Sequence, residues 1–211
     1  MDGTLVDNTE AHLRAFARLC EQYHVYDWQE RIKEVYGMGN EDIMRHVLPE
    51  ALVNEKGIDA LAEEKEGYYR EIYAPEIAPI AGLHALLERL QEAGIRCAVG
   101  SSGPKVNVDF VIEKCQIAKY LSARISGDMV TRCKPDPEIY LKAAAALGVS
   151  PSECLIFEDA RAGIESAARA GAAKIIALST TLSHEEIREH GKADIIIDTF
   201  EELSDLNTLL A

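Results

Sequence analysis

The chain lacks the features that mark secreted, membrane-spanning and nucleic-acid-binding proteins. Its five cysteines are scattered and form no Cys-x-x-Cys pair, which argues against a disulfide framework or a structural zinc site and favours reduced thiols. No apolar run approaches the ~20 residues that cross a bilayer, and we expect no signal peptide. The chain has only 22 basic residues and 36 acidic ones, and the resulting net charge of -14 opposes binding to a nucleic-acid backbone. We therefore expect a cytoplasmic protein with neither a membrane nor a nucleic acid as partner.

Helical and strand-like patterns alternate along the second half of the chain, and an overall hydrophobic content of 47% is ample for a core. Leucines recur at helical spacing over residues 83–93, and Gly94 ends that helix before the apolar stretch 95–99. The same patterns predict further helices over 104–115, 137–147, 163–170 and 183–190, and strands over 124–126, 155–157, 174–178 and 194–197. Short apolar strands separated by helices are typical of a parallel sheet covered on both faces. We therefore predict an α/β fold with a doubly wound parallel sheet.

The first third of the chain has helical patterns and no convincing strand. Helices are expected over 9–23, 41–47 and 57–73, with Asn40 as the N-cap of the second. We expect residues 12–78 to form a helical cap inserted into a core made of residues 1–11 and 79–211. Ligands of open α/β sheets lie beyond the carboxyl ends of the strands, so this cap would cover the site and exclude water.

The loop from Val99 to Pro104 joins the end of a predicted strand to the start of a helix. The hydroxyls and backbone amides of Ser101 and Ser102 can face an anion there, with help from the helix dipole. Ordinary helix capping explains the same residues when the loop is considered alone. The spacing of a nucleotide P-loop is absent.

Lys134 stands between a predicted strand and a predicted helix, followed by Pro135, Asp136 and Pro137. The two prolines hold Lys134 outside the helix, because proline restricts its own backbone and that of the preceding residue. A point charge positioned in this way suits a phosphate group. A helix-start turn with an incidental lysine fits the pattern equally well.

Two adjacent carboxylates, Glu158 and Asp159, follow directly after an apolar strand. Two such charges together are costly without a cation, and oxygen ligands at the end of a strand suit Mg²⁺. Acidic residues also favour the first turn of a helix, which would explain either residue alone. That explanation is weaker for both residues with Gly163 close behind them.

Asp2-Gly3 alone would be typical of a hairpin turn, but its context points elsewhere. Four motifs of this chain also occur in one known superfamily, in the same order and at comparable spacing over nearly the whole chain. They are Asp2-Gly3-Thr4, Ser101-Ser102, Lys134-Pro135-Asp136-Pro137 and Glu158-Asp159. The chain resembles a capped hydrolase of the haloacid dehalogenase superfamily. Within that superfamily it is similar to the β-phosphoglucomutase and sugar-phosphate phosphatase group, which has a Rossmann-like core.

The resemblance implies Mg²⁺-dependent phosphoryl transfer through an aspartyl-phosphate. By this match Asp2 is the general acid/base, with its backbone carbonyl on the metal. Glu158 and Asp159 would complete the metal site. The groups implied around the phosphate are Thr4, Ser101, Ser102 and Lys134. The nucleophilic aspartate of the family stands two residues before Asp2 at the end of the first central strand, so we expect both to lie upstream of Met1.

The cap departs from the mutase pattern. β-Phosphoglucomutases carry Lys-Gly and then Arg in the cap to hold a second phosphate, whereas Tyr36 and Asn40 stand at the corresponding positions here. His12 matches a histidine near the active site of the mutase group, although a half-buried surface histidine would fit the same helix. A cap lining formed by Tyr36, Met38, Asn40 and Glu41 would be polar and weakly charged, which favours sugar or polyol phosphates.

We therefore expect a phosphatase of small phosphorylated metabolites that is a monomer or a weak homodimer. Two alternatives stay open. One is a β-phosphoglucomutase-type phosphotransferase. The other is a chain that binds Mg²⁺ and phosphate without turnover, which would follow if no nucleophile precedes Asp2.

Overall fold

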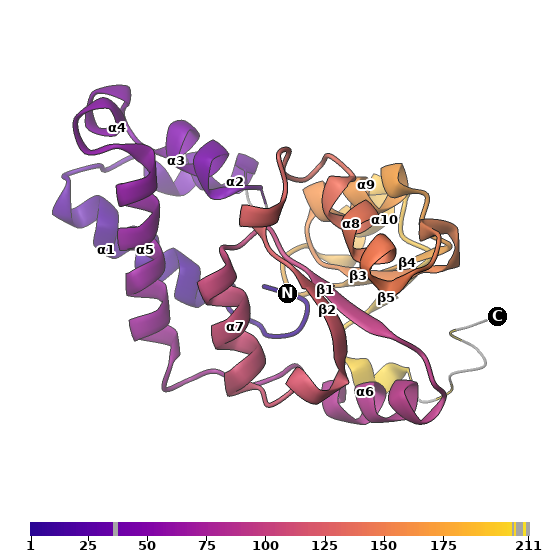
Figure 1. Ribbon diagram of the computed structural model, residues 1–211. Coiled ribbons are helices and arrows are strands. Elements are labelled where there is room, and N and C mark those ends of the chain that lie inside the picture. Colours follow the sequence, from indigo (N-terminus) through magenta and orange to yellow (C-terminus); the bar gives the residue numbers. More distant parts are fainter. Residues whose placement is uncertain (36–37, 204, 206–208, 210–211) are drawn as a thin grey trace.

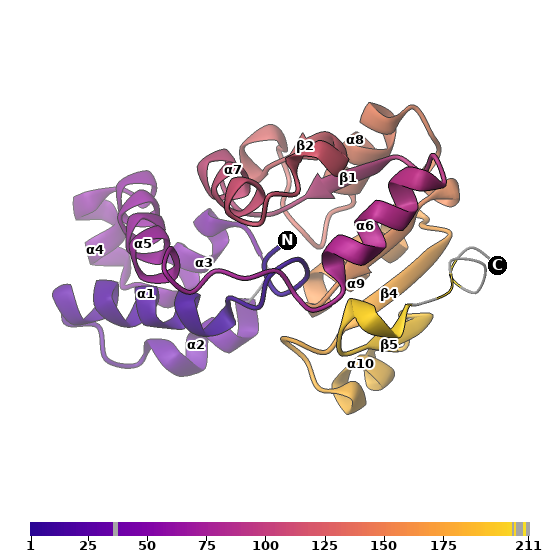
Figure 2. The same cartoon turned by 90° about the horizontal axis from the view of Figure 1, so that it is seen from below.

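The computed structural model describes residues 1–35, 38–203, 205 and 209. Five helices of the first third group together, apart from the strands (Figures 1 and 2). They are α1 (Thr9–Gln22), α2 (Trp28–Val35), α3 (Asn40–Val47), α4 (Glu50–Lys56) and α5 (Ile58–Tyr73). Each buries one face in a shared apolar cluster, in which Phe16 and Leu19 of α1 meet Met44 of α3 and Leu61 of α5.

Two of these helices were not expected from the sequence, and one expected cap was wrong. α2 and α4 span eight and seven residues, too few for a strong periodic signal. Asn40 is the first residue of α3, and Gly39 occupies the N-cap position in extended geometry. The helix therefore begins one residue earlier than expected, and its N-cap glycine has no side chain to make a capping hydrogen bond.

The remaining elements alternate between helix and strand. They are α6 (Leu83–Glu92), β1 (Cys97–Gly100), α7 (Lys105–Lys114), η1 (Ala118–Tyr120), β2 (Leu121–Ile125), η2 (Gly127–Met129), α8 (Glu138–Leu147), η3 (Pro151–Glu153), β3 (Leu155–Glu158), α9 (Arg161–Ala170), β4 (Lys174–Leu178), α10 (His184–His190), β5 (Ile195–Ile197) and η4 (Phe200–Glu202). β1 pairs in parallel with β2, and β3, β4 and β5 form a second parallel set. The predicted α/β class with parallel strands is confirmed.

Alternate residues of β4 show why helices cover both faces. Ile176 and Leu178 pack with α6 and α7, whereas Ile175 and Ala177 pack with α8, α9 and α10. Successive strand residues point to opposite faces, so a strand buried on both sides is apolar throughout. The run Lys174–Leu178 fits that requirement, and it places α6 and α7 on one face and α8 to α10 on the other.

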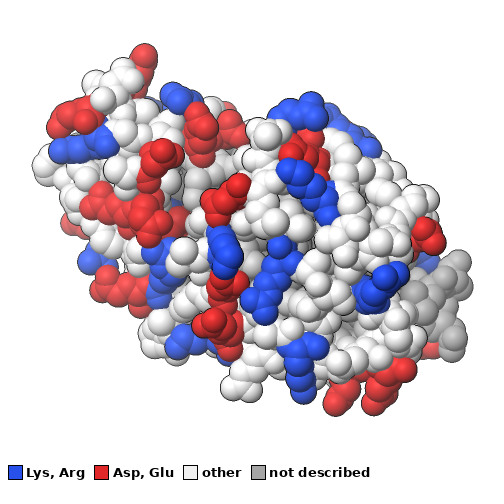
Figure 3. All heavy atoms as spheres, viewed as in Figure 1, with Lys and Arg blue, Asp and Glu red and all other residues white. Residues whose placement is uncertain are grey.

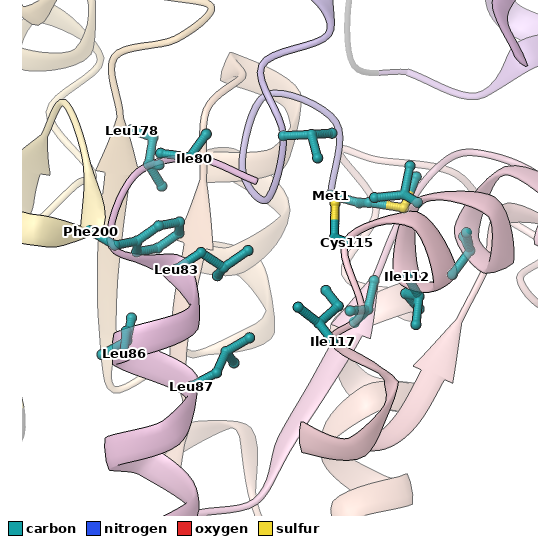
Figure 4. Close-up of a cluster of buried hydrophobic side chains, with 14 of the residues drawn as sticks. Met1, Ile80, Leu83, Leu86, Leu87, Ile112, Cys115, Ile117, Leu178 and Phe200 are labelled. Atoms are coloured by element: carbon teal, nitrogen blue, oxygen red, sulfur yellow. The ribbon is translucent and has the colours of Figure 1, made fainter. Parts of the chain in front are cut away.

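One feature differs from a single continuous sheet: β1 and β3 are not paired with each other. Between the two sets of strands lies an apolar channel of about 450 Å³. Leu83 and Leu87 of α6 face Ile117 and Met1 across it (Figure 4). A strand ahead of Met1 remains a prediction of the sequence.

The excess of acidic over basic residues in the sequence is visible on the surface of the described residues (Figure 3). In the view of Figure 3, acidic side chains gather over the α1–α5 group, with basic residues scattered between them. Within the described part of the chain, no helix combines the length and the apolar character needed to cross a membrane.

Candidate active site

The loops that follow β1 and β3 meet the α1–α5 helices around a cavity of about 90 Å³. Its core side is lined by Asp2, Ser101, Ser102, Lys134, Glu158 and Asp159. Its helical side includes His12, Phe16, Ile32, Met38, Asn40, Ile43, Lys65 and Glu66. Parallel strands bring their carboxyl ends to one edge, which is why motifs 57 residues apart in the chain, at positions 101 and 158, lie together.

Glu158 and Lys134 form an ion pair in the cavity wall, and both side chains are at least nine-tenths buried. The Tyr140 hydroxyl also donates to Glu158, and Lys134 Nζ lies 3.4 Å from the Gly100 carbonyl oxygen. Burial opposes ionisation of Glu158, but the Lys134 ammonium and further partners such as the Tyr140 hydroxyl together outweigh it and hold the pKa of Glu158 below its ordinary value. Gly163 makes room for this carboxylate, since a Cβ there would overlap it.

Unlike Glu158, Asp159 is hydrogen-bonded by hydroxyl groups and forms no ion pair among the described residues. It accepts hydrogen bonds from Thr4 Oγ1 at 3.0 Å and from Thr181 Oγ1 at 2.5 Å. Burial and the neighbouring Glu158 raise the pKa of Asp159 from 3.8 to about 6. Gly3, at φ +62°, passes so close that a Cβ would overlap the Asp159 carboxyl group. Thr4 was expected to contact phosphate, yet its hydroxyl is directed to Asp159, and Thr4 is absent from the described cavity lining.

The oxygen donors here fit a hard divalent cation. Asp159 is a buried carboxyl group whose charge is opposed by its surroundings, and a cation would relieve that opposition. Among the described residues, no three His, Cys, Asp or Glu side chains are grouped as a metal cage. Mg²⁺ does not need one, because it is commonly held by one or two carboxylates together with water and substrate phosphate oxygens.

Asp2 is held by polar side chains of the α1 region. Its Oδ1 accepts from Asn8 Nδ2 at 2.6 Å and lies 3.5 Å from His12 Nε2. Burial opposes ionisation of Asp2, but the interactions with His12, the terminal amine and Asn8 together outweigh it and hold its pKa well below the ordinary value. The His12 ring in turn stacks on Tyr69 of α5, with ring centroids 3.9 Å apart. Asp2 is therefore an ionised carboxylate in this cavity.

The serine loop after β1 combines a hydrogen bond within the loop with a position at the cavity. Ser101 is buried, and its Oγ accepts the Gly103 N–H at 3.1 Å. Its own N–H donates to the Ile125 carbonyl at 2.9 Å, which ties the loop to β2. Ser102 is half-buried and lines the cavity with Gly103. Local hydrogen bonding and a position in the cavity wall thus occur in the same loop.

The expected cap lining is partly present. Met38 and Asn40 line the cavity, but Glu41 is exposed and pairs with Arg45 at 2.9 Å, one helix turn away. Tyr36 lies outside the described residues. The helical wall is also more apolar than expected, because Phe16 and other apolar side chains of α1, α2 and α3 contribute to it.

Sequence reasoning missed Lys65 and Glu66 of α5, which also line the cavity. Lys65 Nζ lies 2.9 Å from His12 Nδ1 and 2.9 Å from Glu66 Oε1, so α5 brings a cation to the cavity. A signal was present in the sequence. Lys65 lies at four-residue spacing between Leu61 and Tyr69, and a lysine within the apolar stripe of a helix is unusual.

Comparisons with known proteins agree with this geometry. The family profile described as haloacid dehalogenase-like hydrolase matches residues 1–177. Validoxylamine A 7'-phosphate phosphatase of Streptomyces hygroscopicus subsp. limoneus is 31% identical over 204 residues, 96% of this chain and 92% of that protein. The phosphorylated carbohydrates phosphatase of Thermotoga maritima is 26% identical over 183 residues, 87% of this chain and 84% of that protein. The crystal structure of CbbY from Rhodobacter sphaeroides in complex with phosphate has a TM-score of 0.83 and 28% identity, covering 99% of this chain and 96% of that one.

Proposed function

Because the chain belongs to the haloacid dehalogenase-like hydrolase family, we propose that it is a Mg²⁺-dependent phosphatase of small phosphorylated metabolites, namely sugar or polyol phosphates. The observation that carries the proposal is the pair of buried carboxyl groups, Glu158 and Asp159, beside Lys134 and Asp2 in one cavity. Two relatives support a small phosphorylated substrate, since their names specify a phosphatase of validoxylamine A 7'-phosphate and one of phosphorylated carbohydrates.

The roles follow from the charges. Asp159, Glu158 and the backbone carbonyl of Asp2 would hold Mg²⁺, which when bound supplies positive charge to the phosphate oxygens. Lys134 and the serine loop at Ser101 and Ser102 would orient the transferring group, since phosphoryl transfer depends mainly on positioning and charge neutralisation. Thr4 would hold the Asp159 carboxylate in place through its hydrogen bond. His12 and Asn40 would contact the remainder of the substrate.

Asp2 would act as the general acid/base. A carboxylate nucleophile is assigned to the position two residues before Asp2, where it would form the aspartyl-phosphate. The channel between β1 and β3 supports this assignment, because its apolar walls and the two facing strand edges suit an additional parallel strand. We propose that residues upstream of Met1 supply that strand, which would contribute its carboxylate at the cavity.

The helical part would act as the cap, over residues 12–78. Its helices have an apolar cluster of their own, with Leu19 and Met44 fully buried, so they can hold their shape independently of the strands. A cap of this kind over the cavity would exclude water from the reacting groups. It would also select the substrate, through residues such as Asn40 and Met38.

The proposal is tested with an extended chain, in which about six apolar residues ending in Phe-Asp precede Met1, a typical strand length of ~5 to 6 residues. We expect this chain to release phosphate from sugar phosphates in Mg²⁺ and to stop when the metal is chelated. A coupled assay for conversion of a sugar 1-phosphate into the 6-phosphate is expected to show none. Efficient conversion would establish the mutase, and metal-independent release would refute the assigned metal site.

A further inference from the structure

The ion pair of Lys65 and Glu66 has no part in the chemistry assigned above, although both side chains line the cavity. They are 3% and 2% exposed, so the pair is removed from water. Lys65 Nζ lies 2.9 Å from Glu66 Oε1 and also 4.7 Å from the centre of the Phe16 ring. Ion pairs buried this deeply often add nothing to stability, because the loss of hydration of each charge offsets their attraction. Their position in the substrate cavity points to a role in recognition.

Glu66 is fixed from both parts of the molecule. Its Oε1 accepts from Lys65, and its Oε2 accepts from Asn107 Nδ2 at 2.6 Å. Asn107 belongs to α7 of the core, and its Oδ1 accepts from Arg70 Nη1 of α5 at 2.7 Å. The Glu66 carboxylate is therefore held in one orientation where the cap meets the core, and it cannot turn away from the cavity without breaking these contacts.

The pair also decides the charge of the cap wall. The other described residues that line this side of the cavity are apolar or uncharged, apart from His12. Burial opposes ionisation of Glu66, but the Lys65 ammonium and further partners outweigh it and hold its pKa below the ordinary value. Glu66 is thus ionised at neutral pH, and its negative charge cancels the positive charge of Lys65.

We propose that Glu66 is a specificity-determining residue that makes the cap wall accept a hydroxylated, uncharged group and reject a second phosphate. This inference rests on the proposed phosphatase function. A hydroxyl can donate to Glu66, whose carboxylate oxygens each accept more than one hydrogen bond, and it can accept from Lys65, whose ammonium has three donors. A second phosphate would instead meet a fixed carboxylate, and like charges brought together without water repel strongly.

The test compares fructose 1-phosphate with fructose 1,6-bisphosphate, which differ by a hydroxyl or a phosphate at carbon 6. We measure kcat and KM for phosphate release by the extended chain and by its Glu66→Gln variant, which keeps the shape of residue 66 and loses the charge. The extended chain without this substitution is expected to prefer the monophosphate. Glu66→Gln is expected to reduce that preference in kcat/KM by about tenfold, mainly through a lower KM for the bisphosphate, and tenfold corresponds to ~1.4 kcal/mol.

Two further variants separate charge from structure. Glu71→Gln removes the same charge from an exposed position of α5 and is expected to leave the preference unchanged. Lys65→Met with Glu66→Gln makes the wall neutral again and is expected to restore the preference. An unchanged preference in Glu66→Gln, or one that the double variant fails to restore, would overturn the inference.

Failure of the proposed function would look different, since no ester would then release phosphate in any variant. In that case the same two esters are compared by isothermal titration calorimetry. A preference for the monophosphate that falls in Glu66→Gln would support the inference on binding alone. Equal affinities in both chains, or no binding, would overturn it.

Discussion

At the scale of residues, two neighbouring carboxyl groups differ because their partners differ. Glu158 has the Lys134 ammonium and the Tyr140 hydroxyl, so its charged form is favoured. Asp159 is equally buried but has hydroxyl donors and the like charge of Glu158, so its pKa is raised to about 6. This contrast follows from side chains that are distant in the sequence, and the motif Glu158-Asp159 alone could not have predicted it.

Asp159→Asn is expected to stabilise the metal-free protein at pH 7 by on the order of 1 kcal/mol, since one pKa unit is ~1.36 kcal/mol. The pKa of Asp159 is raised in the folded state, so the folded state binds more protons than the unfolded one. Its contribution to stability is therefore present below pH 4 and lost as the pH rises through about 6. Urea unfolding in EDTA between pH 4 and pH 7.5 measures this difference.

In Mg²⁺ the wild type is expected to gain stability and the Asp159→Asn variant to gain none. An equal gain in both chains would remove Asp159 from the metal site.

Lys134→Met is expected to destabilise the metal-free protein by about 3 to 5 kcal/mol, because it leaves the buried Glu158 without its cation. Combining Lys134→Met with Glu158→Gln is expected to recover most of the loss, and a double-mutant cycle from denaturant unfolding measures the coupling. Additive losses would show that the two side chains do not interact.

At the scale of elements, the hydrophobic pattern in the second half of the chain predicted most of the helices and strands. Apolar runs such as 174–178 and the glycines that end α8 and α9 predicted those elements within a few residues, because two-sided burial demands unbroken apolar strands. The short, charged helices α2 and α4 were missed, since their burial depends on packing against α3 and α5. Lys65 and Glu66 were missed because a helix pattern shows which face is buried and gives no indication of which cavity that face meets.

Two helical glycines provide a matched comparison at this scale. Gly163 of α9 leaves no room for a Cβ beside Glu158, whereas a Cβ at Gly67 of α5 meets only the end of Arg70 at 4.0 Å. Gly67→Ala is expected to stabilise the protein by ~0.5 to 1 kcal/mol through helix propensity. Gly163→Ala is expected to destabilise it by about 1 to 3 kcal/mol and to weaken Mg²⁺ binding. Thermal unfolding with and without Mg²⁺ checks both, and stabilisation by Gly163→Ala would contradict the observed packing.

At the scale of the whole molecule, the cavity lies where three parts meet: the strands β1 and β2, the strands β3 to β5, and the helices α1 to α5. The sequence motifs predicted which core side chains gather there, since parallel strands align their carboxyl ends. The alternation of helices and strands in the sequence predicted one sheet, whereas the described strands form two sets separated by an apolar channel. Filling that channel would bury apolar surface worth several kcal/mol, at ~25 cal/mol per Å².

The most direct test measures phosphate release and unfolding free energy on three chains: the 211-residue chain, the extended chain, and the extended chain with its added Asp replaced by Asn. We predict that both extended chains are several kcal/mol more stable than the 211-residue chain, and that only the one with Asp releases phosphate from a sugar phosphate in Mg²⁺. This result would separate the chemistry of the carboxylate from the folding of its strand. Equal phosphate release by all three chains would contradict the account, because the nucleophile would then have to lie within the 211 residues.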